Sequence, residues 1–195
     1  MLTSLELARK IAEVYTPLSR PSVHALADIL VRQKYKKGQI ILQQGETCHS
    51  MLFVEKGLVR QFYYKNEKEL TEHIGYENGM IICIESYFRQ EPTRLIVEAL
   101  EPVILWELPK DRFEALANEY PDIEHLYRKI MELSLIESQL KADTLRFEPA
   151  HDRYVKLMKR HPEILERAPL VHIASLLQMT PETLSRVRAA LVQQG

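Results

Sequence analysis

The stretch LQMTPETLSRVR, residues 177–188, joins a clear helix start to a set of polar side chains near the end of a 195-residue chain. Thr180 is a favourable N-cap, Pro181 suits the first position of a helix, and Glu182 stands at the positive end of the helix dipole. The sequence therefore predicts that a helix begins at Pro181 and spans residues 181–192.

The apolar residues around this stretch predict two short helices joined by a three-residue turn. The first helix lies within PLVHIASLLQ, residues 169–178, and the turn is QMT, residues 178–180. Ala174 is small enough for two helices to cross closely there. In the second helix, Leu184, Val187 and Leu191 recur at the spacing of one helical face, which predicts that they pack into a core.

The other side of the second helix carries residue types that recognise nucleic acids. Arginine donates two hydrogen bonds to guanine, glutamate accepts from cytosine, and serine or threonine bonds bases or phosphates. This is the pattern of a helix-turn-helix, whose second helix enters the major groove. A helical hairpin with a solvated charged face fits the same spacing, so both interpretations stay open at this point. The outward residues are Glu182, Ser185, Arg186 and Arg188.

Charge is unevenly distributed along the chain. The net charge is −1, but residues 150–195 hold seven Lys/Arg against four Asp/Glu, a net +3, which leaves −4 for residues 1–149. A basic end on an acidic body is compatible with nucleic-acid contact from that end.

The two cysteines, Cys48 and Cys83, form no CxxC motif and have no His pair at metal spacing. We therefore expect no metal site, and a reduced cytoplasmic protein is the default.

The N-terminus does not resemble a signal peptide, and no apolar run reaches the roughly 18–20 residues that a membrane span needs. The chain offers no nucleophile–base or carboxylate pair, so an enzyme is not expected.

Hydrophobic periodicity divides the chain into helical and β-rich parts. Residues 4–15 and 23–31 predict two amphipathic helices. Residues 34–109 consist of short β-rich runs separated by turn residues, which indicates an antiparallel barrel or sandwich. One of these runs is MIICIES, residues 80–86. After Pro109, a short helix at 111–121 and further helices follow.

Residues 122–146 predict one long helix with two apolar stripes. Two stripes suggest two contacts, one with the β-rich part and one with a partner helix. Burial inside a single monomer is the alternative. The residues that we expect at a dimer interface are Leu126, Ile130, Leu133 and Leu140.

The sequence FEP at 147–149 marks a domain boundary, because Pro149 disfavours helical geometry at the residue before it. The resulting division is an N-terminal helical and β-roll domain (1–117), a dimerisation helix (118–147) and a helical C-terminal domain (148–195). The expected fold class is α+β, with an antiparallel, jelly-roll-like β-roll.

Several segments resemble the Crp/Fnr family of bacterial transcription regulators. HIASLLQMTPETLSRVR (172–188) is similar to the family's helix-turn-helix, with its Glu-x-x-Ser-Arg recognition helix. KKGQIILQQGE (36–46) and FVEKGLVRQFYY (53–64) resemble the opening of its cyclic-nucleotide-binding β-roll. The segment 152–170 resembles a subgroup common in Bacteroidetes-type bacteria. The resemblance covers essentially the whole chain.

The resemblance implies a homodimeric, sequence-specific regulator that binds double-stranded DNA at a near-palindromic site, with RNA polymerase as a further partner. By the family's pattern, Arg186 contacts guanine, Glu182 the opposite cytosine, and Ser185 a base or phosphate. The set of expected DNA-binding residues is Thr180, Glu182, Thr183, Ser185, Arg186 and Arg188.

Three departures from the family pattern carry expectations of their own. Gln178 stands where the family usually has glycine, so the turn must tolerate a side chain there. The sequence ends soon after the recognition helix, which predicts a domain lacking most of the usual β-hairpin wing. In the effector pocket, Cys83 and Ile84 replace the ribose-binding Gly-Glu pair, and Leu95 replaces the hydroxyl residue after Arg94.

These replacements predict an unidentified effector, or none, rather than cAMP, because a buried phosphate needs several donors. Two cysteines are too few for an iron–sulfur cluster. Two alternatives remain open: a cAMP-responsive regulator, and a ligand-binding module that no longer binds DNA.

Overall fold

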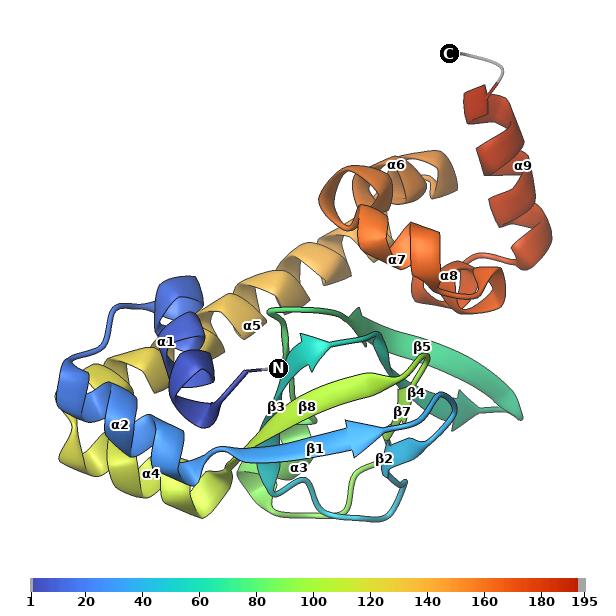
Figure 1. Ribbon diagram of the computed structural model, residues 1–195. Helices are drawn as coiled ribbons and strands as arrows, with labels where there is room; N and C mark the ends of the chain where they lie inside the picture. The colour runs from blue at the N-terminus through green and yellow to red at the C-terminus, as the bar shows by residue number, and fades with distance from the viewer. Residues whose placement is uncertain (1, 193–195) are drawn as a thin grey trace.

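The computed structural model describes residues 2–192. It has the α+β architecture expected from the sequence, with an antiparallel β-roll, one long helix and a helical C-terminal unit (Figure 1). In Figure 1 the long helix α5 (Pro121–Phe147) runs diagonally from the N-terminal helices to the C-terminal ones.

The N-terminal helices begin at well-formed caps. Helix α1 (Ser4–Tyr15) starts with a capping box, in which the Glu6 backbone N–H donates to Thr3 Oγ1 at 3.2 Å and the Thr3 N–H donates to the Glu6 carboxylate at 2.8 Å. Helix α2 (Arg20–Ile29) is capped by the side chain of Ser19. Both helices were predicted, although α2 starts three residues earlier than expected and the first strand already begins at Val31.

The roll consists of two four-stranded antiparallel sheets. Their strand orders are β1-β8-β3-β6 and β2-β7-β4-β5. Register is defined by pairs such as Val31 opposite Glu107 and Val59 opposite Gly75. The strands are β1 (Val31–Tyr35), β2 (Ile40–Leu42), β3 (Ser50–Lys56), β4 (Val59–Lys65), β5 (Lys68–Gly75), β6 (Met80–Ile81), β7 (Ile96–Ala99) and β8 (Val103–Pro109).

Two turns show why the strands meet at these registers. Asn66 and Glu67 both have positive φ, 50° and 62°, which is the two-residue hairpin geometry that matches the twist of β4 and β5. Between β3 and β4, Gly57 has φ 105°, and a Cβ there would lie 2.8 Å from the Pro102 carbonyl oxygen. Only glycine satisfies both conditions.

The run MIICIES, residues 80–86, corrects the sequence interpretation. Only Met80–Ile81 forms a strand, and the chain then turns into helix α3 (Ile84–Arg89), with Cys83 as its N-cap residue. An apolar run this short reads equally well as a strand or as the start of a helix, and here tertiary context decides. The helix ends at Gln90, which has a left-handed backbone with φ 55°.

One hydrophobic core joins the roll to the helices beside it. Buried residues of both sheets pack in one cluster with residues of α1, α2, α4 (Lys110–Glu119) and the first half of α5. The expected boundary at residues 117 and 118 therefore falls inside α4, and α5 belongs partly to the core of the roll. The α5 residues in this core are Ile123, Leu126 and Ile130.

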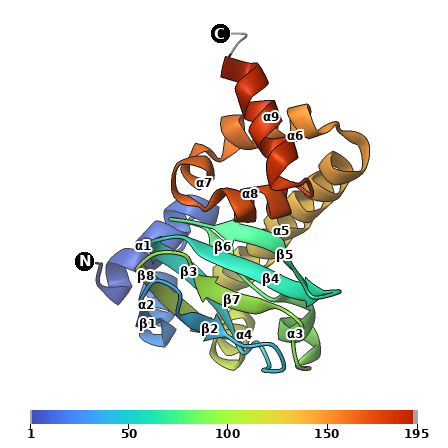
Figure 2. The same ribbon diagram turned by 90° about the vertical axis from the view of Figure 1, so that its right-hand side faces the viewer.

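A second core lies in the C-terminal unit, which contains α6 (Ala150–Arg160), α7 (Pro162–Arg167), α8 (Leu170–Leu176) and α9 (Pro181–Val192). Two residues of the roll take part in it, so the unit packs against the β-roll as well as on itself (Figure 2). None of the helices within residues 2–192 is long and apolar enough to cross a membrane. The buried members of this core are Leu58, Ile74, Tyr154, Leu157, Ile164, Ala168, Ile173, Ala174, Leu177 and Leu184.

Candidate nucleic-acid interface

Helices α8 and α9 form the predicted pair. Ile173 and Ala174 of α8 are buried against Leu184 of α9, so the two helices cross where the sequence offers a small residue. The turn between them is closed by the Met179 N–H, which donates to the Ala174 carbonyl oxygen at 3.0 Å. The sequence predicted the close crossing at Ala174 and the inward position of Leu184.

Gln178 has a left-handed backbone, with φ 49°. The concern raised by the sequence is therefore confirmed at this residue: the turn needs the conformation that glycine adopts most easily, and a glutamine adopts it instead. The Gln178 N–H donates to the Ser175 carbonyl oxygen at 3.0 Å. The turn therefore keeps its geometry at a local cost in backbone energy.

The start of α9 is fixed by threonine hydroxyls. Thr180 Oγ1 accepts a hydrogen bond from the Thr183 backbone N–H at 3.2 Å, as expected of an N-cap. Thr183 Oγ1 in turn accepts from Arg186 Nη2 at 3.2 Å. The hydroxyl of Thr180 lowers the pKa of Glu182, which keeps this carboxyl ionised. The threonines at the start of α9 thus contact Glu182 and Arg186, the charged residues of its first two turns.

The outward face of α9 carries the residues singled out from the sequence. Glu182, Ser185 and Arg186 are exposed on the side opposite Leu184 and Val187. A continuous polar strip on a helix whose other side is buried can be presented to a groove without disturbing the fold.

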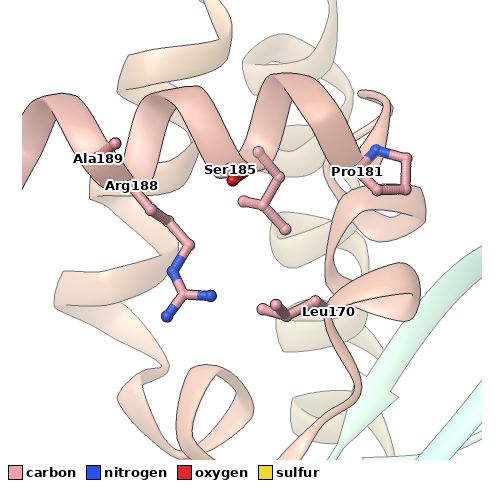
Figure 3. A pocket seen from close by; sticks show the side chains of 6 residues that line it. Leu170, Pro181, Ser185, Arg188 and Ala189 are labelled. Atoms are coloured by element: carbon pink, nitrogen blue, oxygen red, sulfur yellow. The ribbon is translucent and has the colours of Figure 1, made fainter.

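Arg188 lies on the flank of this strip rather than at its centre. It lines a shallow pocket of about 250 Å³ between the start of α8 and α9, and its side chain extends toward Leu170 (Figure 3). The remaining lining residues are Pro181, Leu184, Ser185 and Ala189. A guanidinium at the edge of the recognition face is placed to reach a phosphate rather than a base.

The four expected effector-pocket residues are not assembled into one polar cage. Cys83 is buried, whereas Ile84 and Arg94 are exposed and Leu95 packs partly against the core. The Arg94 guanidinium lies 4.7 Å from the centroid of the Tyr63 ring, and within residues 2–192 it makes no hydrogen bond or ion pair.

Sequence reasoning missed a buried charge cluster on the outer side of β4. Arg60 is only 2% exposed and donates to Thr71 Oγ1, Glu69 and Glu98, each at 2.9 Å. Its guanidinium also stacks on the Phe62 ring, 4.1 Å from the ring centroid. An arginine in a strand ordinarily predicts a solvated face. Nothing in the local pattern shows that another part of the chain covers it.

Helix α8 is the element that covers this side of the roll. Ser175 Oγ accepts from the Thr71 backbone N–H at 2.8 Å and lies 3.3 Å from the Glu69 carbonyl oxygen, to which it donates. The partners are more than a hundred residues apart in sequence, so no spacing rule could have found the contact.

A second contact ties α7 to the roll. Arg167 donates to both oxygens of Glu77, at 2.7 and 3.0 Å, and pairs with Glu101. Burial alone would raise the pKa of Glu77, but the hydrogen bonds from Arg167 and from the Gly57 N–H lower it to about 2. Charged and polar groups therefore add to the apolar packing of Leu58 and Ile74 in holding the C-terminal unit against the roll.

The exposed face of α5 differs from the expected dimer interface. Leu126 is 0% exposed and Ile130 1%, so both belong to the chain's own core and cannot meet a partner, which corrects the sequence prediction for these two. Leu133 and Leu140 are exposed as expected, and Ile136 and Phe147 join them at spacings of three, four and seven residues. Beyond residue 131, α5 keeps a polar contact with the roll, because Lys141 Nζ donates to the carbonyl oxygen and the carboxylate of Glu72 on β5, while this apolar face stays exposed.

Comparisons with known proteins agree with this architecture. A model of the cyclic nucleotide-binding domain matches residues 32–120, which run from β1 to the end of α4. The cyclic AMP receptor protein of Thermus thermophilus is 26% identical over 170 residues, covering 84% of this chain and 78% of that protein. The transcriptional activator protein FnrA of Stutzerimonas stutzeri is 24% identical over 192 residues, covering 91% and 78%. The matched domain and these two relatives support a place for this chain in the Crp/Fnr family.

Solved structures show the same fold. FixK2 from Bradyrhizobium japonicum superposes on this chain with a TM-score of 0.72 at 17% identity, covering 86% of each chain. The regulator CLP of Xanthomonas campestris gives a TM-score of 0.68 at 18% identity, covering 91% of this chain and 93% of that one. The expectation of a reduced wing concerns residues beyond Val192. It lies outside the described residues and stays a prediction.

Proposed function

We propose that this chain is a sequence-specific DNA-binding transcription regulator of the Crp/Fnr family, and that its recognition helix is α9. The observation that carries the proposal is the polar strip of Glu182, Ser185 and Arg186, exposed on a helix whose start is fixed by Thr180 and whose opposite face is buried. A helix held in this way can enter the major groove as a rigid unit. The regulators among its relatives support the same assignment.

The roles of the side chains follow from their chemistry and position. Arg186 gives up its hydrogen bond to Thr183 and donates instead to O6 and N7 of guanine. The ionised Glu182 carboxylate accepts a hydrogen bond from the amino group of the opposite cytosine. Ser185 bonds a base or a phosphate. Thr180, Thr183 and Arg188, around the edge of the strip, hold the phosphate backbone and fix the register.

The functional unit is a homodimer formed through the second half of α5. Leu133, Ile136 and Leu140 form an apolar stripe at three- and four-residue spacing, the seam of a two-helix coiled coil. Two copies related by a two-fold axis present two recognition helices to half-sites about one helical turn apart, so the site is a near-palindrome. RNA polymerase is the expected partner of the DNA-bound dimer.

The β-roll is the site of control by an effector other than cAMP. Ile84 offers no carboxylate to a ribose, and Leu95 offers no hydroxyl beside Arg94, whose guanidinium stacks on Tyr63. A cAMP-responsive protein is the second candidate, because the domain matched by residues 32–120 is the cyclic nucleotide-binding domain. Calorimetry with cAMP and cGMP decides between them. Micromolar binding would favour the second candidate.

The proposal is tested by selecting bound sequences from a randomised duplex pool and measuring the affinity of the selected site by fluorescence anisotropy. We expect a two-fold symmetric consensus and an affinity that falls steeply with salt concentration, because phosphate contacts release counterions. Arg9→Ala, an exposed arginine on α1, is the matched control and should leave binding unchanged. A protein that enriches no sequence, even at low salt, would instead be a module that has lost DNA binding.

A further inference from the structure

The pocket between the start of α8 and α9 is lined mainly by apolar groups. Its volume is about 250 Å³. Leu170, the first residue of α8, forms one wall, and Pro181 and Ala189 line the pocket from α9 (Figure 3). The buried Leu184 completes the apolar lining. Leu170 is 49% exposed, so an apolar surface faces solvent here, and covering it with an apolar group of a ligand is favourable.

The pocket adjoins the face that we assign to DNA. Ser185 lines the pocket and also belongs to the polar strip, together with Glu182 and Arg186. Pro181 and Ala189 stand four residues before and four residues after Ser185, and both are exposed. Residues four apart are neighbours on a helix surface, so the pocket and the strip are adjacent surfaces of α9. A duplex that meets the strip therefore also covers the pocket.

The polar groups of the pocket indicate the chemistry of its occupant. Ser185 and Arg188 are the polar side chains among its lining residues, and within residues 2–192 no acidic side chain lines it. The Arg188 side chain extends along the pocket toward Leu170 (Figure 3). This lining fits an apolar group that has an anion beside it. In the major groove of DNA, the apolar group is the 5-methyl of thymine and the anions are the phosphates.

We infer that this pocket reads one thymine in each half-site through its 5-methyl group, an inference that rests on the proposed function. The methyl group packs against Leu170 and Pro181, and the neighbouring phosphate pairs with Arg188. Leu170 is therefore a specificity-determining residue that lies on α8, outside the recognition helix. A deoxyribose is also apolar, but it is the same in every nucleotide, so its contact with the pocket gives binding without a preference for thymine.

The size of the effect follows from the burial of one methyl group, which corresponds to roughly a fourfold change in the dissociation constant. Uracil presents the same O4 acceptor as thymine and lacks only the methyl group, so it isolates this contact. Leu170→Ala removes most of the apolar wall and leaves the polar strip on α9 unchanged. It should therefore remove the preference for thymine over uracil without abolishing DNA binding.

The test replaces each thymine of the selected site by deoxyuridine, one position at a time in both half-sites, and measures the affinity of the full chain by fluorescence anisotropy. We expect one position per half-site at which the unmutated chain loses roughly fourfold in affinity per replaced methyl group. Leu170→Ala should bind the thymine and uracil duplexes equally at that position. Melting temperatures show whether the variants fold.

Val171→Ala is the matched control. Val171 is the next residue of α8 and is 56% exposed, but it does not belong to the lining of the pocket. This variant loses a similar amount of exposed apolar surface and should keep the full preference for thymine.

Three results would overturn the inference. The selected half-site could contain no thymine, every thymine could be replaced by uracil without loss of affinity, or Leu170→Ala could keep the full preference. In each of these cases the unmutated chain still binds its selected site, so the proposed function stands. A chain that enriches no sequence fails at the earlier selection step, and then both the proposed function and this inference are wrong.

Discussion

Gln178 shows how a single backbone angle shapes the recognition unit. With φ 49°, it places a side chain in a conformation that costs an L-residue about 1 kcal/mol relative to glycine. We expect Gln178→Gly to raise the free energy of unfolding by about 0.5–1 kcal/mol in urea denaturation, since relief of strain outweighs the larger entropy of the unfolded chain. Gln178→Ala keeps the Cβ and is the control, which should show no gain. A loss on Gln178→Gly would mean that the turn is not strained.

Arg186 and Arg188 belong to one helix but should behave differently in DNA binding. Arg186→Ala is expected to cost about 1–3 kcal/mol and to relax the preference at one base pair per half-site, because a bidentate base contact is lost. Arg188→Ala, on the pocket side of the strip, should weaken binding to all sequences alike and reduce the salt slope by about 1. Anisotropy titrations on the selected site and its single-base variants separate the two. A uniform loss for Arg186→Ala would make that residue a phosphate contact.

For single residues, the sequence predicted the features that depend on the chemistry of near neighbours. The cap at Thr180, the positive φ at Gln178 and the outward Glu182 and Arg186 all follow from neighbours within a few residues. The burial of Arg60 depends on a helix more than a hundred residues away in the sequence, and residue spacing carries no information about that contact.

Among the elements, α5 is one helix in two environments. Its first half belongs to the core of the roll and its second half presents Leu133, Ile136 and Leu140 outward. The sequence predicted the helix to within one residue at each end. It assigned Leu126 and Ile130 to the partner interface because the same three- and four-residue spacing serves a core and a coiled coil equally. Helix α3 was missed for a similar reason, since a short apolar run does not reveal its period.

The stripe on α5 predicts the oligomeric state. Leu140→Glu, at a position 41% exposed in the single chain, should raise the dissociation constant of the dimer at least tenfold, because it places a charge in the apolar seam. Light scattering across a dilution series measures this effect. Leu135→Glu is the matched control: this leucine is also exposed but lies off the stripe, so the dimer should persist. An unmutated chain that is a monomer at all concentrations would contradict the prediction.

For the whole molecule, the central feature is the contact between the C-terminal unit and the roll, which combines the Arg167–Glu77 ion pair with the burial of Leu58 and Ile74. Glu77 has its pKa lowered to about 2, below the ordinary value of 4.5, so its stabilising effect is complete above about pH 5 and is lost as pH falls toward 2. We expect Arg167→Met to cost about 1–2 kcal/mol of unfolding free energy at pH 7, a value reduced by solvent screening of these half-exposed groups. The difference from the unmutated chain should shrink between pH 5 and pH 2.

Denaturant unfolding at a series of pH values measures that difference. Lys68→Met, which removes an exposed cation on β5 that has no ion-pair partner within residues 2–192, is the control and should give a small effect at every pH. A constant difference for Arg167→Met across the pH range would assign its cost to lost packing rather than to the ion pair.

The arrangement of the two cores is the part of the fold that the sequence could not supply. The order of helical and β-rich segments was readable from periodicity, and Pro149 marked the break at 147–149. The docking of α8 on the roll depends on the hydrogen bonds of Ser175 with the backbone of Thr71 and Glu69. No pattern in the sequence predicts that these residues are in contact.

That docking has a consequence for solubility. Strand β5 is the last strand of its sheet, and the Ser175 hydroxyl occupies the Thr71 backbone N–H that would otherwise face solvent. An uncovered strand edge is a template for pairing with another chain, which leads to aggregation. The C-terminal unit therefore also prevents the edge of the sheet at β5 from pairing with another chain. A β-roll severed from it should self-associate through β5, however well its own core is packed.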